Sequence, residues 1–340
     1  MSKTRIGLMG FGRIGRNVLR LLHEHPGLEI AVIDDIADLE GLAYLLKYDS
    51  IYGRFPGTVE HRDGHLVVDD AQIPFVSGRE PGTTDWSAFG VDIVVQATGK
   101  YRTRAWCEKH LEAGAGKVIL ASTPETGDVP ILLKGVNDEV LDGADIVSLG
   151  SNTSNAIAPI LKTLDAAFGV DRAFFTTVHA LTNSQRLADV PSEGFRQSRA
   201  AGENIIPATT NSAEILAEVM PEFAGKLSAV ALNVPVADGS TVDLVAQVRT
   251  DASVSDVNQA VEAACRSTYD GIVEYCADPI VSSDVRQSKY SAVYDSLATM
   301  VMDGTMLKTI TWFNNGWGYT ARLLEVADAM AASLEKGASA

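Results

Sequence analysis

Cysteine is scarce in this sequence of 340 residues: only Cys107, Cys265 and Cys276 occur, and no two of them form a Cys-x-x-Cys pair. A chain of this length has no need of a disulfide framework, and the spacing offers no thiol metal motif. Cys107 and His110 lie at helical spacing, but two ligands without a third are weak evidence for a metal. We therefore expect no metal site and assign the cysteines to packing.

Long apolar runs and an excess of basic charge are also missing. No segment approaches the roughly 18 apolar residues of a membrane helix, and glycine and arginine interrupt the first fifteen residues. Acidic residues number 44 against 28 basic ones, a net charge of −16, which disfavours nucleic acid and anionic membranes as partners. We therefore expect a cytoplasmic protein whose partner is a small molecule.

A glycine-rich turn follows the first apolar segment. Gly10, Gly12 and Gly15 form Gly-x-Gly-x-x-Gly between a predicted strand and a predicted helix. The first glycine of this motif permits the tight turn, the second lets a pyrophosphate approach, and the third lets helix and strand pack closely. Asp35 ends the next predicted strand, where a carboxylate binds a ribose hydroxyl and repels a 2′-phosphate. The pattern favours NAD over NADP; the alternative is a glycine turn without a ligand.

The remaining pattern predicts two domains, because single cores stop growing at roughly 250–300 residues. Short apolar runs alternate with helical segments up to Gly150, as in a parallel, doubly wound sheet. From Asp171 the strand candidates are longer, which indicates a mixed or antiparallel sheet. The segment from 180 to 207 has little regular pattern, and ordered loops of that length usually bind a ligand or a neighbouring subunit. The predicted helices of this half are Thr210–Met220, Ser253–Arg266 and Gly318–Leu334.

Across nearly its whole length the sequence resembles the glyceraldehyde-3-phosphate dehydrogenase family. The matching words, in order, are GFGRIGR, LLKYDSIYGRF, ATG, GVND, TTVHALTNSQ, RAAGENIIPATT, GKLSAVALNVPV, STVDLV, VSSDVR and TWFNNGWGY. The resemblance implies an α/β protein. Its NAD-binding Rossmann domain would take residues 1–151 and 316–340, and an α+β catalytic domain residues 152–315. It also implies a long S-shaped loop at about 180–207 and a homotetramer.

The cofactor positions of the family carry over to this sequence. One departure is Met9, where the family usually has asparagine before the glycine turn, and we expect it to weaken hydrogen bonding there. The residues that the resemblance assigns to NAD binding are Gly10, Gly12, Arg13, Ile14, Gly15, Asp35, Thr98, Gly99 and Asn315.

The chemistry positions depart from the family. Its elbow reads Ser-Cys-Thr-Thr-Asn, and its cysteine attacks the aldehyde, whereas Asn152 stands here. His179 matches the catalytic histidine. Gln197 and Asn233 stand where the family has phosphate-binding arginines, and Asn211 stands where it has glycine. The resemblance assigns the substrate to Ser151, Thr153, Thr182, Gln197, Thr210, Asn211 and Asn233.

Three hypotheses follow from these departures. An amide is no nucleophile, so a thioester route through Asn152 is excluded. The first hypothesis is direct hydride transfer between NAD and a substrate less anionic than a triose phosphate, with His179 as acid/base and Asn152 as a hydrogen-bond donor. The second is a non-catalytic NAD-binding or regulatory protein. The third is an ordinary dehydrogenase with an engineered nucleophile, which Gln197, Asn233, Asn211 and Met9 disfavour. Lys100, Arg102 and Arg104 could form an alternative anion patch, but a solvated surface is the preferred interpretation.

Overall fold

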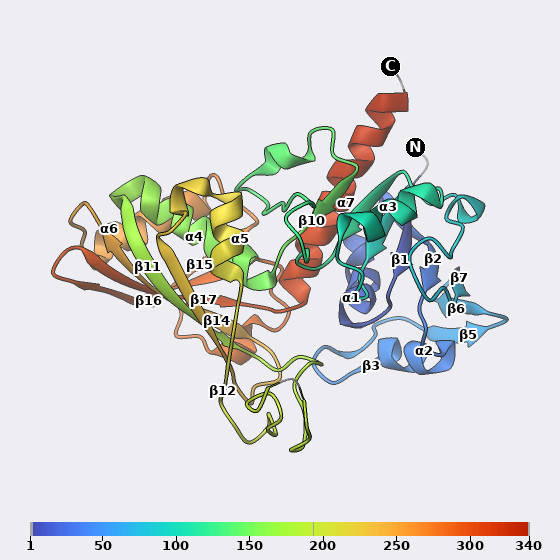
Figure 1. Ribbon diagram of the computed structural model, residues 1–340, viewed down its shortest axis with the longest axis horizontal. Coiled ribbons are helices and arrows are strands. Elements are labelled where there is room, and N and C mark those ends of the chain that lie inside the picture. Colours follow the sequence, from blue (N-terminus) through green and yellow to red (C-terminus); the bar gives the residue numbers. More distant parts are fainter. Residues whose placement is uncertain (1–2, 193, 339–340) are drawn as a thin grey trace. The chain divides into compact units, whose positions relative to one another are not determined.

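The computed structural model describes residues 3–192 and 194–338. They form two compact units. Unit 1 comprises Met1–Leu132, Asp138–Gly150 and Thr320–Ala340, and unit 2 comprises Leu133–Asn137 and Ser151–Tyr319. Figure 1 shows the elements of both units. The division therefore falls between Gly150 and Ser151, immediately before the elbow that carries Asn152.

Unit 1 contains an eight-stranded sheet in the order β10-β9-β8-β1-β2-β7-β6-β5. The first six strands of that order are parallel, and the β5–β6–β7 segment adds antiparallel pairing at one edge. The strands are β1 (Thr4–Met9), β2 (Leu28–Asp34), β5 (Val59–Arg62), β6 (His65–Val68), β7 (Ala71–Val76), β8 (Ile93–Gln96), β9 (Lys117–Leu120) and β10 (Ile146–Ser148).

Helices connect these strands, as the alternating pattern predicts. They are α1 (Arg13–Leu21), α2 (Leu39–Lys47) and α3 (Arg104–Glu112), with short 3-10 turns η1 (Leu22–Glu24), η2 (Ser87–Phe89) and η3 (Asp138–Leu141). Helix α7 (Trp317–Ala338) follows the last strand of the chain, and its residues from Thr320 onward belong to unit 1. A small hairpin pairs β3 (Tyr48–Asp49) with β4 (Gly53–Arg54). Among the helices of the described ranges, none has the length and apolarity that crossing a membrane requires.

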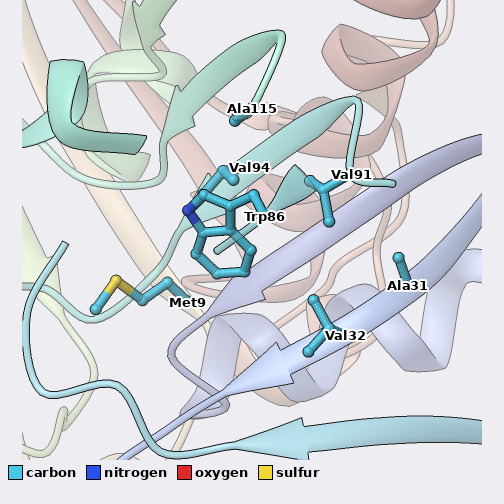
Figure 2. Packing of buried hydrophobic residues seen from close by; sticks show 7 residues of the cluster. All are labelled: Met9, Ala31, Val32, Trp86, Val91, Val94 and Ala115. Atoms are coloured by element: carbon cyan, nitrogen blue, oxygen red, sulfur yellow. The ribbon is translucent and has the colours of Figure 1, made fainter. Parts of the chain in front are cut away.

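One apolar cluster of unit 1 is built around Trp86, which is fully buried. Figure 2 shows its indole beside Met9 and Val94. A side chain at Gly7 would meet the Trp86 ring at 2.9 Å, so glycine is needed in β1 at this point. Burial of a large apolar side chain is worth about 1.5–3 kcal/mol. Met9 therefore stabilises the base of the glycine turn by packing.

Unit 2 is built on a seven-stranded mixed sheet in the order β12-β13-β11-β14-β17-β16-β15. Together with the parallel sheet of unit 1, it confirms the predicted fold class. The strands are β11 (Val170–His179), β12 (Ile206–Ala208), β13 (Leu227–Asn233), β14 (Ser240–Val248), β15 (Val273–Cys276), β16 (Ala292–Met302) and β17 (Met306–Phe313). The helices are α4 (Asn152–Phe168), α5 (Ser212–Val219) and α6 (Val254–Cys265), with η4 (Pro221–Phe223) and η5 (Ser282–Val285).

The two faces of the unit 2 sheet differ. In β14 and β17 burial alternates strictly, so every second side chain is buried. Helices α4, α5 and α6 pack on strands of this sheet, and Figure 1 shows them beside it. The other face leaves apolar side chains exposed, including Phe174 and Val230. The segment from 180 to 205 contains no helix or strand in its described residues, apart from one isolated bridge between Arg186 and Ala200.

Candidate functional site

The three glycines of unit 1 have the geometry that a dinucleotide turn requires. Gly10 has φ +99°, and a Cβ there would meet the backbone of Ala97 at 2.7 Å. A Cβ on Gly15 would collide with the carbonyl oxygen of Gly10, whereas nothing lies within 4 Å of one on Gly12. Gly12 therefore leaves open space before α1, and no side chain caps this helix. The residues present fit a bound pyrophosphate, because the helix N-terminus directs N–H groups into that space.

Asp35 lies at the end of β2 and holds the glycine turn. Its Oδ2 accepts a hydrogen bond from the Phe11 amide at 2.6 Å, and its Oδ1 accepts one from Ala37 at 2.9 Å. Asp34 is buried instead, and it accepts from the Gly78 amide at 2.6 Å and from the Thr84 hydroxyl at 2.5 Å. Burial raises the pKa of the Asp34 carboxyl. Asp35 is therefore the carboxylate exposed to a ligand.

A pocket of about 200 Å³ surrounds this position. Its lining includes Gly10, Gly12, Asp35, Thr98 and Lys100. Arg13 and Ile14 begin α1 directly beyond Gly12, and Gly99 turns the chain after β8 with φ +69°. All the predicted cofactor residues of unit 1 thus lie at or beside one end of its parallel sheet, where doubly wound sheets bind ligands.

The arginines that follow Lys100 have acidic partners. Arg102 lies 3.3 Å from Glu125, and Arg104 donates to Glu108 at 2.9 Å. These pairs are partly exposed, as a solvated surface requires. Nothing in this geometry favours a dedicated anion site at the two arginines.

The elbow that carries Asn152 opens α4. Ser151 is the N-cap residue, and its hydroxyl accepts a hydrogen bond from the Ser154 amide at 3.0 Å. Asn152 is the first residue of the helix; its Nδ2 donates to the Asn315 carbonyl at 3.0 Å, and its Oδ1 accepts from the Thr153 amide at 2.8 Å. Thr153 itself is buried. One of the two amide protons of Asn152 is therefore already committed within the protein.

His179 ends β11, and the parallel register pairs it with Asn233 of β13. Its Nδ1 lies 2.6 Å from the backbone carbonyl oxygen of Ala180, and because that oxygen can only accept a hydrogen bond, Nδ1 carries the proton and donates it. The neutral ring is therefore the tautomer with its lone pair on Nε2. Phe313 contacts the ring edge-on, with 6.2 Å between the centroids. The fold thus brings two predicted site residues, His179 and Asn233, to adjacent strand ends.

Ser240 joins His179 and Asn152 through one chain of hydrogen bonds. The Ala180 amide donates to the Ser240 hydroxyl at 2.9 Å, and that hydroxyl donates to Oδ1 of Asn315 at 2.5 Å. The backbone carbonyl oxygen of the same residue, Asn315, accepts a hydrogen bond from Nδ2 of Asn152. Ser240 is not among the site residues that the sequence predicts, although the word STVDLV begins with it. A buried serine has no sequence signature, since its value depends on residues distant in the chain.

The other predicted substrate residues lie in the long segment or at the start of α5. Thr182 donates its hydroxyl to Gln185 at 2.8 Å, and Thr210 exchanges a hydrogen bond with Ser212 at 2.9 Å at the start of α5. Asn211 is the N-cap residue of α5 and makes no side-chain capping bond. Gln197 is exposed in the long segment, and in the described ranges no hydrogen bond joins it to Asn152 or His179.

The two buried cysteines do not compensate for the missing nucleophile. Burial raises the pKa of both Cys107 and Cys265 to about 12, so neither forms a thiolate at neutral pH. His110 is fully buried and accepts a hydrogen bond from the Trp86 indole at 3.0 Å. Across residues 3–192 and 194–338, no group of three or more His, Cys, Asp and Glu side chains could hold a metal.

Comparison with known proteins agrees with this geometry. Residues 4–104 match the glyceraldehyde 3-phosphate dehydrogenase NAD binding domain, and residues 151–315 match the C-terminal domain of the same family. The glyceraldehyde-3-phosphate dehydrogenase of Geobacillus stearothermophilus is 42% identical over 95% of this chain and 97% of its own length. The corresponding Salmonella typhimurium protein is 39% identical over 95% of this chain and 97% of its own length. These matches confirm NAD as the cofactor and an NAD-dependent oxidoreductase family, and the chain belongs to the glyceraldehyde-3-phosphate dehydrogenase family.

Proposed function

We propose that this protein transfers hydride directly between NAD and a carbonyl or alcohol substrate, without a covalent intermediate. Unit 1 holds the cofactor, and unit 2 holds the substrate. The observation that carries the proposal is the identity and placement of Asn152 at the first position of α4. An amide cannot form a thioester, while its remaining N–H can donate to an oxygen on which negative charge develops.

His179 supplies the proton in this mechanism. Because Nδ1 donates to the Ala180 carbonyl, the proton that moves is the one on Nε2. In the direction of carbonyl reduction, protonated His179 gives that proton to the substrate oxygen, and Asn152 donates a hydrogen bond to the same oxygen. NADH, when bound at the glycine turn of unit 1, would supply the hydride. In the reverse direction, neutral His179 accepts the hydroxyl proton.

The substrate that these residues favour is less anionic than a triose phosphate. Gln197, Asn211 and Asn233 offer neutral amides, and Ser151, Thr153, Thr182 and Thr210 offer hydroxyls. Arginine binds phosphate through a charged bidentate fork, with hydrogen bonds worth roughly 1.5–3 kcal/mol each. Two amides in place of two arginines therefore weaken phosphate binding by several kcal/mol. The class of substrate is a neutral or weakly anionic hydroxycarbonyl compound or its alcohol.

The proposal predicts NADH oxidation with a panel of neutral and weakly anionic aldehydes and ketones. The decrease in NADH absorbance measures the reaction. A His179→Asn variant should lose at least about a hundredfold in rate, since a positioned acid/base contributes about 10²–10⁴-fold. Phosphorylated aldehydes should be poor substrates. A preference for triose phosphates would contradict the assignment of the substrate class.

Restoring the thiol gives a second test. An Asn152→Cys variant should remain almost inactive toward triose phosphate, because Gln197 and Asn233 still lack the guanidinium groups that hold a phosphate. Phosphate-dependent NAD reduction with glyceraldehyde 3-phosphate measures this. Fast turnover by the single variant would overturn the argument from the two amides and favour an engineered nucleophile.

A non-catalytic NAD-binding or regulatory protein is the second candidate. The observation that favours it is the engagement of the Asn152 amide with Asn315 and Thr153, which leaves a single N–H for a substrate. This candidate predicts NAD binding with no oxidation of NADH by any carbonyl compound. Calorimetric NAD titration beside the absorbance assay separates the two candidates.

A homotetramer in the cytoplasm completes the proposal. The exposed apolar face of the unit 2 sheet supports self-association, because monomers rarely expose contiguous apolar patches. Phe174 and Val230 lie on this face, in adjacent strands. The net charge of −16 supports the exclusion of nucleic acid and anionic membranes as partners.

A further inference from the structure

Ser240 is the first residue of β14 and is fully buried. Its hydroxyl accepts a hydrogen bond from the Ala180 amide and has one proton of its own to donate. That proton goes to Oδ1 of Asn315 at 2.5 Å. A reversed Asn315 amide would leave the serine proton without this acceptor, so Ser240 selects one of the two amide orientations.

The selected orientation leaves a donor without a partner. Asn315 is 6% exposed, and its Nδ2 is buried and makes no hydrogen bond to any described residue. A buried N–H without an acceptor is costly, and most such groups in native proteins are paired. The arrangement is therefore complementary to a ligand that supplies a carbonyl oxygen.

A second contact keeps the Asn315 backbone in place. Asp238 accepts a hydrogen bond from Nδ2 of Asn314 at 2.6 Å, while Oδ1 of Asn314 accepts from the Gly316 amide at 2.8 Å. Between Asp238 and Ser240 stands Gly239 with φ +82°, where a Cβ would collide with the Ser282 carbonyl. We call residues 238–240 the Asp238–Ser240 clamp. It holds Asn314 with one side chain and Asn315 with the other.

We propose that Ser240 is a positioning residue for the nicotinamide. It orients the Asn315 amide so that Nδ2 donates to the carboxamide oxygen, and it links that amide to the chain segment that carries His179. This inference rests on the proposed function, because it takes Asn315, which the family resemblance assigns to NAD binding, as the residue that contacts the nicotinamide. One hydroxyl then determines both the orientation of the nicotinamide and the position of the chain segment that carries His179.

The experiment compares NADH with ADP-ribose, which lacks the nicotinamide, by calorimetric titration. A Ser240→Ala variant should bind NADH about tenfold more weakly, the effect of losing one well-formed hydrogen bond. Its ADP-ribose affinity should stay within about twofold. Ser291→Ala is the matched control, because Ser291 is also a buried serine of unit 2 but its hydroxyl has no partner among the described residues. That control should change neither affinity.

A double-mutant cycle tests the link to Asn315. Asn315→Ala should reduce NADH affinity at least as much as Ser240→Ala, and the double variant should lose no more than Asn315→Ala alone. Additive losses would overturn the proposal, as would an unchanged ratio of NADH to ADP-ribose affinity in Ser240→Ala. An unchanged ratio that comes from equal losses for both ligands would mean that Ser240 has a merely structural role.

Failure of the underlying function gives a different result. If the unmodified protein bound NADH no better than ADP-ribose, the nicotinamide contact of Asn315 would be refuted, and the role of Ser240 with it. If the unmodified protein discriminates strongly and Ser240→Ala still does, only the positioning role fails. The two failures are therefore distinguished by the unmodified protein alone.

Discussion

At the scale of single residues, the glycines of the turn are required for two different reasons, packing of the fold and access for the ligand. The sequence motif does not distinguish these reasons. Gly15 is needed by the fold, because a Cβ there would collide with the Gly10 carbonyl. Gly12 is needed only by the ligand, since nothing of the protein lies within 4 Å of a Cβ at that position. Substitution should therefore affect stability at one glycine and cofactor binding at the other.

A pair of alanine variants tests this separation. Gly15→Ala should lower the free energy of unfolding by about 1–3 kcal/mol, the usual cost of overpacking. Gly12→Ala should change it by less than about 0.5 kcal/mol and weaken NAD binding at least about tenfold, because a methyl group occupies the pyrophosphate position. Thermal denaturation and NAD titration measure the two effects. Equal destabilisation by both variants would contradict the geometry.

At the scale of elements, helix α3 is fixed to the core of unit 1 by His110. This residue is fully buried, and its Nδ1 accepts from Trp86. Burial lowers the pKa of His110 from 6.5 to about 4. Between pH 4 and pH 6.5 the unfolded chain therefore carries a proton on His110, whereas the folded protein does not.

Stability should consequently fall as the pH decreases from 6.5 towards 4. The expected loss is about 3 kcal/mol, because one pKa unit corresponds to about 1.4 kcal/mol. Urea denaturation at several pH values measures it. A His110→Asn variant keeps an acceptor for the Trp86 indole and does not titrate, so its stability should depend less on pH in this interval. An identical pH dependence in both proteins would show that another group is responsible.

At the scale of the whole molecule, one face of the unit 2 sheet exposes apolar side chains to solvent. This outer face is the one opposite α4, α5 and α6. Strand register places Phe174 and Val245 on one face, together with Ile310 and Lys308 of β17. Phe174 is 67% exposed. Such a face is suited to another copy of the chain, because apolar burial is the main favourable term in association.

The proposed homotetramer should therefore dissociate when this face is charged. A Phe174→Glu and Val230→Glu double variant should have a smaller mass by light scattering coupled to size-exclusion chromatography, because each buried carboxylate carries a desolvation cost. Val254→Glu is the control, since Val254 is exposed to a similar degree as Val230 but begins α6. An unchanged mass in the double variant would locate the subunit contacts elsewhere.

Much of the fold could be predicted from the sequence, because local patterns encode it. The predicted helix Ser253–Arg266 corresponds to α6, Val254–Cys265, since a serine cap and an apolar stripe define it locally. The predicted start at Thr210 is wrong by two residues, because Thr210 instead bonds to Ser212 before α5 begins. The predicted last helix, Gly318–Leu334, starts one residue too late and stops too soon, because α7 runs from Trp317 to Ala338.

The sequence by itself determined the NAD-binding turn, the fold class and the absence of a nucleophile at Asn152. Each of these depends on residue identity and on spacing within a short segment. Only the tertiary structure decided the arrangement around His179, where Asn233 is placed by strand register and Ser240 by hydrogen bonds to Ala180 and Asn315. The physical reason is that a hydrogen bond depends on distance and direction between groups, and for residues far apart in the chain the fold alone sets both.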